Sequence, residues 1–243
     1  MKRITALALA AAGGLLLWRR ARSAEDPGIL GPDAVRNLYD RLAPVYDALA
    51  SGYGLVGGSA YRQRAVEALS LRPGDTVVDL ACGTGANFPY LVQVVGAEGR
   101  VIGVDMSPGM LAQAHQRVED AGWETVELVE ADVREFTFPE GVRGVLSTFG
   151  LEMVPEHEAV VRRALVALAP GGRIAVGGLR HPERWPEWVV RLGALVNRPF
   201  GVSQAYEDVQ PWRSVQALAE DVRYQEHLLG AAYLTSGQAP AVS

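Results

Sequence analysis

The sequence predicts an α/β fold with a doubly wound, mostly parallel sheet preceded by N-terminal helices. Between residues 76 and 179, short runs of β-branched residues alternate with amphipathic segments of helical period, which is typical of a parallel α/β sheet. A glycine-rich turn follows the first run, and the second run ends in an acidic residue. With 243 residues and 49% hydrophobic content, the chain is expected to form one domain with a sizeable core.

The segment before the sheet is predicted to be a linker followed by two helices. Residues 24–32 contain two prolines and two glycines and predict the linker. Asp33 is placed to cap the first helix, which is expected to end before Pro44 because proline disfavours helical backbone at the preceding residue. The elements expected after it are a glycine-rich mobile loop over 52–58, a helix over 61–69 and a turn over 72–75.

The alternation then assigns the strands and the helices that cover them. Ser107 and Pro108 predict the N-terminus of a helix, and Gly122 predicts its end. Pro155 is expected to start another helix, which the Pro-Gly-Gly sequence at 170–172 breaks. Strands are expected from Val77 and at 101–104, 126–129, 145–148 and 173–176, a helix at 87–95, and two C-terminal strands at 222–229 and 232–235.

The turn after the first strand and the end of the second strand predict a nucleoside-binding site. Glycines at 83 and 85 allow a sharp turn and a close approach of a ligand to the backbone, and Asp105 can accept hydrogen bonds from a ribose. In the dinucleotide pattern G-x-G-x-x-G, the third glycine permits close packing beneath a pyrophosphate. Phe88 stands at that position and argues against a dinucleotide, although not against a nucleoside.

Charge and cysteine content exclude several classes of function. Residues 1–22 carry five basic side chains and no acid, so the rest of the chain has 18 basic and 28 acidic residues, a net charge of −10. An acidic body is poorly matched to a nucleic-acid backbone. The single cysteine, Cys82, excludes an intrachain disulfide and a multi-cysteine metal site, and we interpret it as a small filler residue in the turn. No metal site is expected.

Four segments carry a resemblance to a known family. The turn Asp79-Leu80-Ala81-Cys82-Gly83-Thr84-Gly85 resembles motif I of the class I S-adenosylmethionine-dependent methyltransferases, with Ala81 in place of the first glycine. The turn at 168–174 resembles the family's signature before its fifth strand. The doubled Tyr-Asp at 39–47 resembles the enzymes that methylate ubiquinone or menaquinone precursors and phosphatidylethanolamine. The Trp-Pro-x-Trp segment at 180–188 looks like that of bacterial phosphatidylethanolamine N-methyltransferases.

The resemblance implies a Rossmann-like, seven-stranded sheet with a C-terminal antiparallel strand, and S-adenosyl-L-methionine as the cofactor. Asp79 would lie near the methionine ammonium, and the amides of the glycine turn would approach the carboxylate. Asp105 would accept from the ribose hydroxyls, and Asp132 from the adenine amine. The residues implied in cofactor binding are Asp79, Ala81, Gly83, Gly85, Asp105, Met106, Asp132, Val133 and Thr148.

Methyl transfer from a sulfonium is an in-line displacement, so alignment supplies much of the acceleration and a base is needed only if the acceptor loses a proton. The candidate catalytic residues are Tyr39, Tyr46 and His181, with Glu152 as a further possible base. Ser147-Thr148-Phe149-Gly150 stands where methyltransferases of nucleic-acid or amide nitrogens carry Asn/Asp-Pro-Pro-Tyr/Phe, which disfavours those substrates.

We expect a membrane-associated, amphipathic or lipid-like acceptor. N-methylation of an aminophospholipid is the first expectation, and C-methylation of a quinone precursor or methylation of another small molecule is the alternative. Trp185, Trp188 and Trp212 are candidates for an amphipathic lip or for aromatic faces around a methylated ammonium. A nicotinamide-dependent oxidoreductase and a non-enzymatic nucleoside-binding protein are the alternatives from other classes.

The N-terminus contains an apolar segment without a charge, residues 4–18, between two pairs of basic residues. As a helix it would span about 22 Å, less than the roughly 30 Å of a hydrocarbon core. A signal peptide, a short anchor, an interfacial helix and a frayed tail all remain open. We favour a cytoplasmic enzyme held at the membrane through this segment, with residues 1–23 as the anchor or interfacial helix, 24–32 as the linker and 33–243 as the methyltransferase domain.

Overall fold

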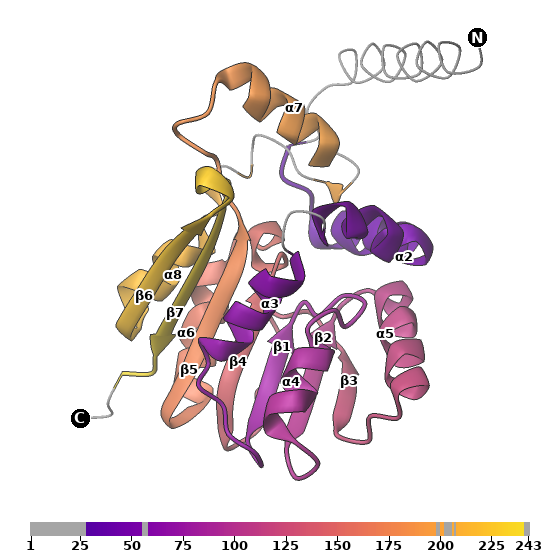
Figure 1. Ribbon diagram of the computed structural model, residues 1–243, viewed down its shortest axis with the longest axis vertical. Coiled ribbons are helices and arrows are strands. Elements are labelled where there is room, and N and C mark those ends of the chain that lie inside the picture. The colour runs from indigo at the N-terminus through magenta and orange to yellow at the C-terminus, as the bar shows by residue number, and fades with distance from the viewer. Residues whose placement is uncertain (1–27, 55–57, 198–199, 202–205, 207, 241–243) are drawn as a thin grey trace.

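The computed structural model describes residues 28–54, 58–197, 200–201, 206 and 208–240. These residues form one seven-stranded sheet with the strand order β3-β2-β1-β4-β5-β7-β6 (Figure 1). Every pairing from β3 to β5 is parallel, and β7 runs antiparallel to both β5 and β6. This confirms the predicted fold class and the C-terminal antiparallel strand. The strands are β1 (Thr76–Leu80), β2 (Arg100–Asp105), β3 (Val126–Glu130), β4 (Val142–Thr148), β5 (Leu168–Leu179), β6 (Glu220–His227) and β7 (Ala232–Gln238).

Two apolar layers cover the sheet, one on each face. On one face, α3 (Gly58–Glu67), α4 (Phe88–Val95) and α5 (Pro108–Ala121) pack on the strands. On the other, α6 (His157–Ala167) and α8 (Pro211–Leu218) do so. The side chains of β1 alternate between the layers, since Val77 joins the first cluster and Val78 and Leu80 join the second. The central strands are therefore apolar on both sides, as a parallel sheet requires.

The N-terminal helix differs from the prediction. α2 (Pro32–Gly54) continues through Pro44 instead of ending before it, and its last residues occupy part of the expected loop at 52–58. A proline inside a helix removes one backbone hydrogen bond. Contacts on both sides of the proline hold this helix in place, because Asp40 and Asp47 are each hydrogen-bonded to the body of the domain.

Other boundaries agree with the sequence to within a few residues. The Ser107 side chain accepts a hydrogen bond from the Met110 amide, and Gly122 ends α5 in the left-handed conformation, as predicted. α6 begins at His157 instead of Pro155. The Pro-Gly-Gly sequence at 170–172, which was expected to end this helix, lies within β5. The sequence did not reveal α7 (Glu187–Asn197) or α8.

The apolar segment at 4–18 lies outside the described residues, as does the linker before residue 28. Among the residues that are described, no helix has the length and apolarity needed to cross a bilayer.

Candidate active site

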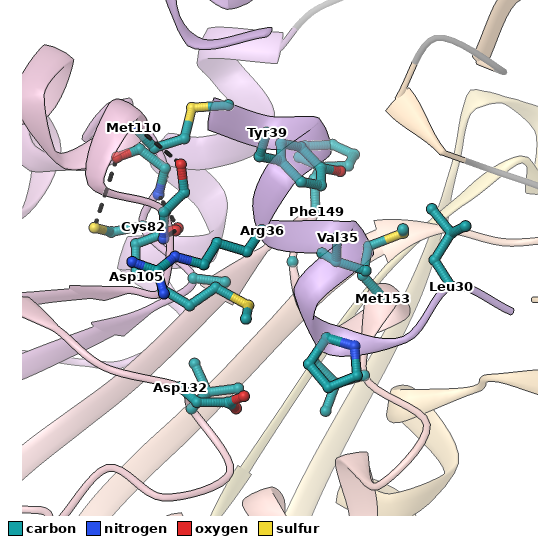
Figure 2. A pocket seen from close by; sticks show the side chains of 18 of the residues that line it. Leu30, Val35, Arg36, Tyr39, Cys82, Asp105, Met110, Asp132, Phe149 and Met153 are labelled. Atoms are coloured by element: carbon teal, nitrogen blue, oxygen red, sulfur yellow. Dashed lines mark hydrogen bonds between the residues drawn. The ribbon is translucent and has the colours of Figure 1, made fainter. Parts of the chain in front are cut away.

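A cavity of about 310 Å³ lies at the carboxyl ends of the central parallel strands, beneath α2. Its volume is at the lower end of the roughly 300–1,000 Å³ of small-molecule sites. Figure 2 shows Leu30, Val35 and Met153 gathered on one side, and Asp105 and Asp132 on another. Nine of the residues that the sequence assigned to the site line it: Tyr39, Tyr46, Ala81, Gly83, Asp105, Met106, Asp132, Val133 and Thr148.

Asp105 is anchored at the tip of β2 by backbone amides. One carboxylate oxygen accepts from the Gly83 amide at 2.8 Å and the other from the Ser107 amide at 2.9 Å. Burial raises the pKa of Asp105, and the hydrogen bonds from these amides oppose that rise. Each oxygen keeps further lone-pair capacity for a ligand. The carboxylate is thus held in one orientation with room to accept the two hydroxyls of a ribose.

The glycine turn is shaped by a buried aromatic ring. Gly83 and Gly85 have φ values of +56° and +76°, in the left-handed region that glycine adopts without strain. A Cβ added at Gly85 would lie 2.4 Å from the ring of Phe88, which is fully buried, while a Cβ at Gly83 would meet open space. Phe88 therefore fills the position below the turn, whereas Gly83 faces the cavity. Gly85 is not among the cavity-lining residues and supports the turn from behind.

In the doubled Tyr-Asp sequence, the tyrosines and the aspartates make different contacts. Tyr39 and Tyr46 line the cavity with their ring centroids 6.1 Å apart. Asp40 accepts from the Gly109 amide at 2.9 Å at the N-terminus of α5, and Asp47 accepts from the Thr84 hydroxyl at 2.6 Å in the glycine turn. The aspartates thus hold α2 over the glycine turn and over the N-terminus of α5. The seven-residue spacing of the two Tyr-Asp pairs is a sequence signal for these contacts. The sequence analysis predicted a role only for the tyrosines.

Tyr39 is partly buried and lies near the acidic residues of the site. Burial, with Tyr46 and Asp105 nearby, raises the pKa of Tyr39 well above its ordinary value of 10.0. Its hydroxyl donates to the Phe200 carbonyl at 3.3 Å. That hydroxyl has a single proton, so its oxygen is left to accept a hydrogen bond from a bound ligand.

A buried polar network that the sequence did not reveal lies behind the glycine turn. The Asn87 amide donates to both Asp79 oxygens at 3.0 and 3.1 Å and to the Thr148 hydroxyl at 3.0 Å. From α3, Arg62 donates to the Asn87 side chain at 2.9 Å and to Thr148, and its guanidinium lies 5.4 Å from the centre of the Phe149 ring. Burial raises the pKa of Asp79 to about 7 and lowers that of Arg62.

Arg62 brings a cation to the cavity wall, whereas Asp79 does not line it. The hydrogen-bond partners of Arg62 among the described residues are the neutral side chains of Asn87 and Thr148. A buried cation is costly unless it is paired with an anion or fully hydrogen-bonded. The position suits a carboxylate ligand at this end of the cavity.

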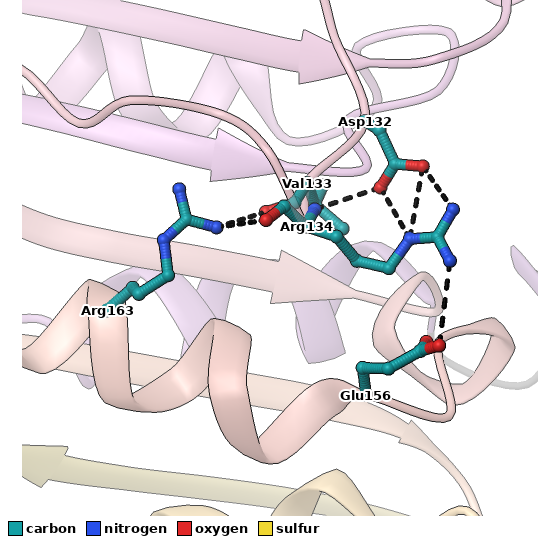
Figure 3. A network of polar contacts seen from close by, with 5 residues as sticks. All are labelled: Asp132, Val133, Arg134, Glu156 and Arg163. Atoms are coloured by element: carbon teal, nitrogen blue, oxygen red, sulfur yellow. Dashed lines mark hydrogen bonds and ion pairs between the residues drawn. The ribbon is translucent and has the colours of Figure 1, made fainter.

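Asp132 is hydrogen-bonded to Arg134, two residues further along the chain. Both of its oxygens accept from the Arg134 guanidinium, which also faces Glu156 at 3.6 Å (Figure 3). The hydrogen bond from Arg134 lowers the pKa of Asp132 and keeps it ionised. Arg163 donates to the Arg134 carbonyl and so holds this loop to α6. If Asp132 accepts from an adenine amine as predicted, its carboxylate accepts from Arg134 and from the adenine at the same time.

Glu152 is a buried carboxyl at the edge of the site. Its Oε1 accepts from the Tyr233 hydroxyl at 3.1 Å, and its buried Oε2 has no hydrogen-bond partner among the described residues. Burial raises the pKa of Glu152 from 4.5 to about 7. Its neighbours Gly150 and Met153 line the cavity, although Glu152 itself does not. A carboxyl of this kind can exchange a proton near neutral pH.

Two other candidates lie away from the cavity. His181, just beyond the end of β5, is exposed and is not among the cavity-lining residues. The Trp212 ring centroid lies 5.6 Å from Arg180 Cζ and 5.3 Å from the Tyr224 ring centroid, so Trp212 belongs to the body of the domain. Trp188 is 70% exposed and remains a candidate for a surface lip.

The cavity fits S-adenosylmethionine on its own chemistry. An anchored carboxylate faces the ribose position, a glycine with open space at its Cβ allows the amino-acid end to approach, and a second carboxylate lies at the far side. Among the described residues, no group of acidic, histidine and cysteine side chains is placed to hold a metal ion.

Comparison with known proteins agrees with this fit. Residues 77–172 match a family model described as a methyltransferase domain. The chain is 31% identical over 190 residues to a 2-phytyl-1,4-naphtoquinone methyltransferase of Thermosynechococcus vestitus, covering 75% of this chain and 83% of that protein. It is 28% identical to a demethylmenaquinone methyltransferase of Listeria welshimeri, covering 64% of this chain and 66% of that protein.

Solved structures show the same fold at lower identity. A SAM-dependent methyltransferase from Aquifex aeolicus aligns with a TM-score of 0.52 and 17% identity over 79% of this chain and 98% of that chain. A Haemonchus contortus phospholethanolamine N-methyltransferase aligns with a TM-score of 0.64 and 14% identity over 85% of this chain and 60% of that chain. The chain belongs to the class I S-adenosylmethionine-dependent methyltransferases and resembles its quinone-biosynthesis group.

Proposed function

We propose that this enzyme transfers a methyl group from S-adenosylmethionine to a ring carbon of a lipophilic quinone precursor. The observation that carries the proposal is the match to a quinone methyltransferase at 31% identity over 83% of that protein's length. The sequence alone ranked an aminophospholipid first. The comparisons do not confirm that substrate, because the N-methyltransferase structures among the matches are only 14% and 17% identical.

The cavity supports an apolar, flat acceptor. Leu30, Val35 and Met153 gather on one side of it, and the Phe149 ring also lines it. Apolar and aromatic walls favour an aromatic ring through burial of its surface. Tyr39 adds a phenol oxygen that can accept a hydrogen bond from a hydroxyl of the ring.

The residues of the chain have separate roles in this proposal. The bound cofactor supplies an electrophilic methyl group on a sulfonium. Asp105 holds the ribose, and Arg62 faces the methionine carboxylate beside the Gly83 amide. Methylation at a ring carbon releases one proton. Tyr39, Tyr46 and His181 are the predicted catalytic residues, although His181 lies outside the cavity. Glu152, whose pKa lies near 7 and whose neighbours Gly150 and Met153 line the cavity, is a further candidate to accept that proton.

The membrane is part of the same proposal. A quinone precursor with a lipid tail resides in the bilayer, and the uncharged segment at 4–18 is suited to hold a cytoplasmic enzyme there. Comparing the membrane-bound fraction of the full chain with that of a chain lacking residues 1–22 tests this role. Equal distribution of the two would contradict it.

The acceptor is tested by supplying radiolabelled S-adenosylmethionine and total membrane lipids to the enzyme and separating the products. We expect the label in the quinone fraction. Label in a phospholipid would establish the aminophospholipid alternative, and label in neither fraction would contradict both.

Replacing Asp105 by alanine is expected to weaken S-adenosylmethionine binding by about 1–3 kcal/mol, because hydrogen bonds to a charged group are lost. Asp105→Asn, which keeps the shape and one acceptor oxygen, should lose less. Calorimetric titration measures the affinity, with Asp120→Ala on the exposed side of α5 as the matched control. Unchanged affinity in Asp105→Ala would show that this carboxylate does not hold the ribose.

A further inference from the structure

Four apolar side chains form an exposed tip beside α7. Leu228 and Leu229, in the turn between β6 and β7, are 41% and 87% exposed, and Trp188 at the start of α7 is 70% exposed. The indole of Trp185, which is partly exposed, donates to the Leu229 carbonyl at 3.0 Å and ties the two segments together. We call Trp185, Trp188, Leu228 and Leu229 the tryptophan–leucine tip.

The backbone of this tip is unfavourable for the residues it carries. Leu228 and Leu229 have φ values of +50° and +53°, in the left-handed region that favours glycine or asparagine. Leu229 gains little burial there in the isolated protein, and neither leucine gains a relaxed backbone. Strained positions of this kind cluster at functional sites. Folding of the domain alone therefore does not account for two leucines in this turn.

The tip lies at the same end of the molecule as the cavity. The strand register pairs Thr148 with Gly177, and Leu179 with Ala232, which follows the turn directly. Figure 1 shows α7 and the β6–β7 turn at the end of the sheet where α2 lies. At the cavity mouth, Ile29 lines the cavity and is 48% exposed.

The short stretch between the N-terminal apolar segment and the cavity mouth limits how far apart the two can lie. Nine residues, 19–27, separate the uncharged segment at 4–18 from Gly28, next to the mouth. Fully extended, they reach about 30 Å. A bilayer that holds residues 4–18 is therefore within about 30 Å of Gly28, which precedes Ile29 at the cavity mouth.

The charges around the tip favour a neutral surface. Arg180 is paired with Glu183 at 2.9 Å and with Glu226 at 2.6 Å. Residues 23–243 carry a net charge of −10, which disfavours an anionic partner. Tryptophan prefers the interface between lipid headgroups and hydrocarbon, and leucine prefers the hydrocarbon.

We propose that the tryptophan–leucine tip inserts into the surface of a lipid bilayer and turns the cavity mouth toward it. The reason for such an orientation, access to a lipophilic acceptor, rests on the proposed function. The insertion itself does not, because it requires only the tip and a bilayer. It is driven by burial of apolar surface, so it should depend weakly on salt.

Insertion is tested with a fluorophore on the full-length chain and phosphatidylcholine vesicles. Cys82 is buried, so a cysteine introduced by Leu229→Cys is the accessible site for an environment-sensitive label. Val166→Cys on α6, which is 82% exposed, provides the matched control. We expect a blue shift on addition of vesicles for the label at position 229 and none at 166. No shift at position 229 would overturn the proposal.

A second measurement separates insertion from folding. The double variant Leu228→Asn with Leu229→Gly should lower the vesicle partition coefficient of the full chain about a hundredfold, because two apolar side chains are removed. Its thermal stability should be equal to or above that of the wild type, since both replacements suit the left-handed backbone. An unchanged partition coefficient would contradict the proposal. A fluorescence shift that depends on protein concentration without vesicles would assign the tip to a second copy of the chain. Neither measurement contains a methyl acceptor, so failure of the proposed function leaves them unaffected.

Discussion

Replacing Gly85 by alanine is expected to lower the free energy of unfolding by about 2–5 kcal/mol. The backbone there has a φ of +76°, and the added Cβ would lie 2.4 and 2.5 Å from two atoms of the Phe88 ring. Left-handed backbone costs an L-residue about 1–2 kcal/mol, and overpacking of a buried site adds about 1–3 kcal/mol. Urea unfolding followed by circular dichroism measures the change.

Gly122→Ala is the matched control for this substitution. Gly122 has a similar φ of +66°, but a Cβ there would meet nothing within 4 Å. It should therefore show only the backbone cost, about 1–2 kcal/mol. Adding Phe88→Leu to Gly85→Ala should cost less than the sum of the two single changes, because the clash is relieved. Equal losses at Gly85 and Gly122 would contradict the packing argument.

The stability of the wild type is expected to fall between pH 5 and pH 8 because of Glu152. Its folded-state pKa of about 7 is above its ordinary value of 4.5, so the folded protein binds more protons in this range. The stabilising effect of the protonated carboxyl is complete below about pH 4.5 and is lost as the pH rises through 7. The loss is on the order of 3 kcal/mol.

Glu152→Gln should remove this part of the pH dependence. Relative to the wild type, the variant should gain stability as the pH rises from 5 to 8, because its neutral amide does not titrate. Urea unfolding at pH 5, 6.5 and 8 measures the difference, and Glu98→Gln at an exposed turn serves as the control. A constant difference between variant and wild type at all three pH values would show that the buried carboxyl does not titrate in this range.

If Glu152 also accepts the proton of the reaction, the same variant has a kinetic signature. The wild-type turnover number should rise through pH 7 as the carboxyl ionises, and Glu152→Gln should lose that rise. A catalytic rate that keeps its pH profile in the variant would leave Glu152 with a structural role only.

Local features of the sequence predicted the turns of the site. The positions of Gly83, Asp105 and Asp132 follow from the pattern of strand, turn and acidic residue, because the carboxyl ends of parallel strands meet at one edge of the sheet. Phe88 also had a local signal, and the structure gives it a packing role beneath Gly85 and Gly103.

Local sequence patterns did not predict the contacts between segments that are far apart in the chain. Arg62 is one of several arginines in its segment, and its position beside Thr148 depends on how α3 packs on the sheet. Pro44 predicted the end of a helix by a local rule, which the tertiary hydrogen bonds of Asp40 and Asp47 overrode. Trp188 and Trp212 were indistinguishable in the sequence, yet one is exposed and the other is packed.

The sequence by itself determined the fold, the cofactor and the strand-end residues that line the cavity, because periodicity and turn chemistry are local properties of the chain. Only the tertiary structure decided the contacts that hold α2 in place, the buried network around Arg62, the protonation of Glu152 and the exposed tip. Each of these depends on burial or on contacts between residues far apart in the chain, and neither is encoded in any short stretch of sequence.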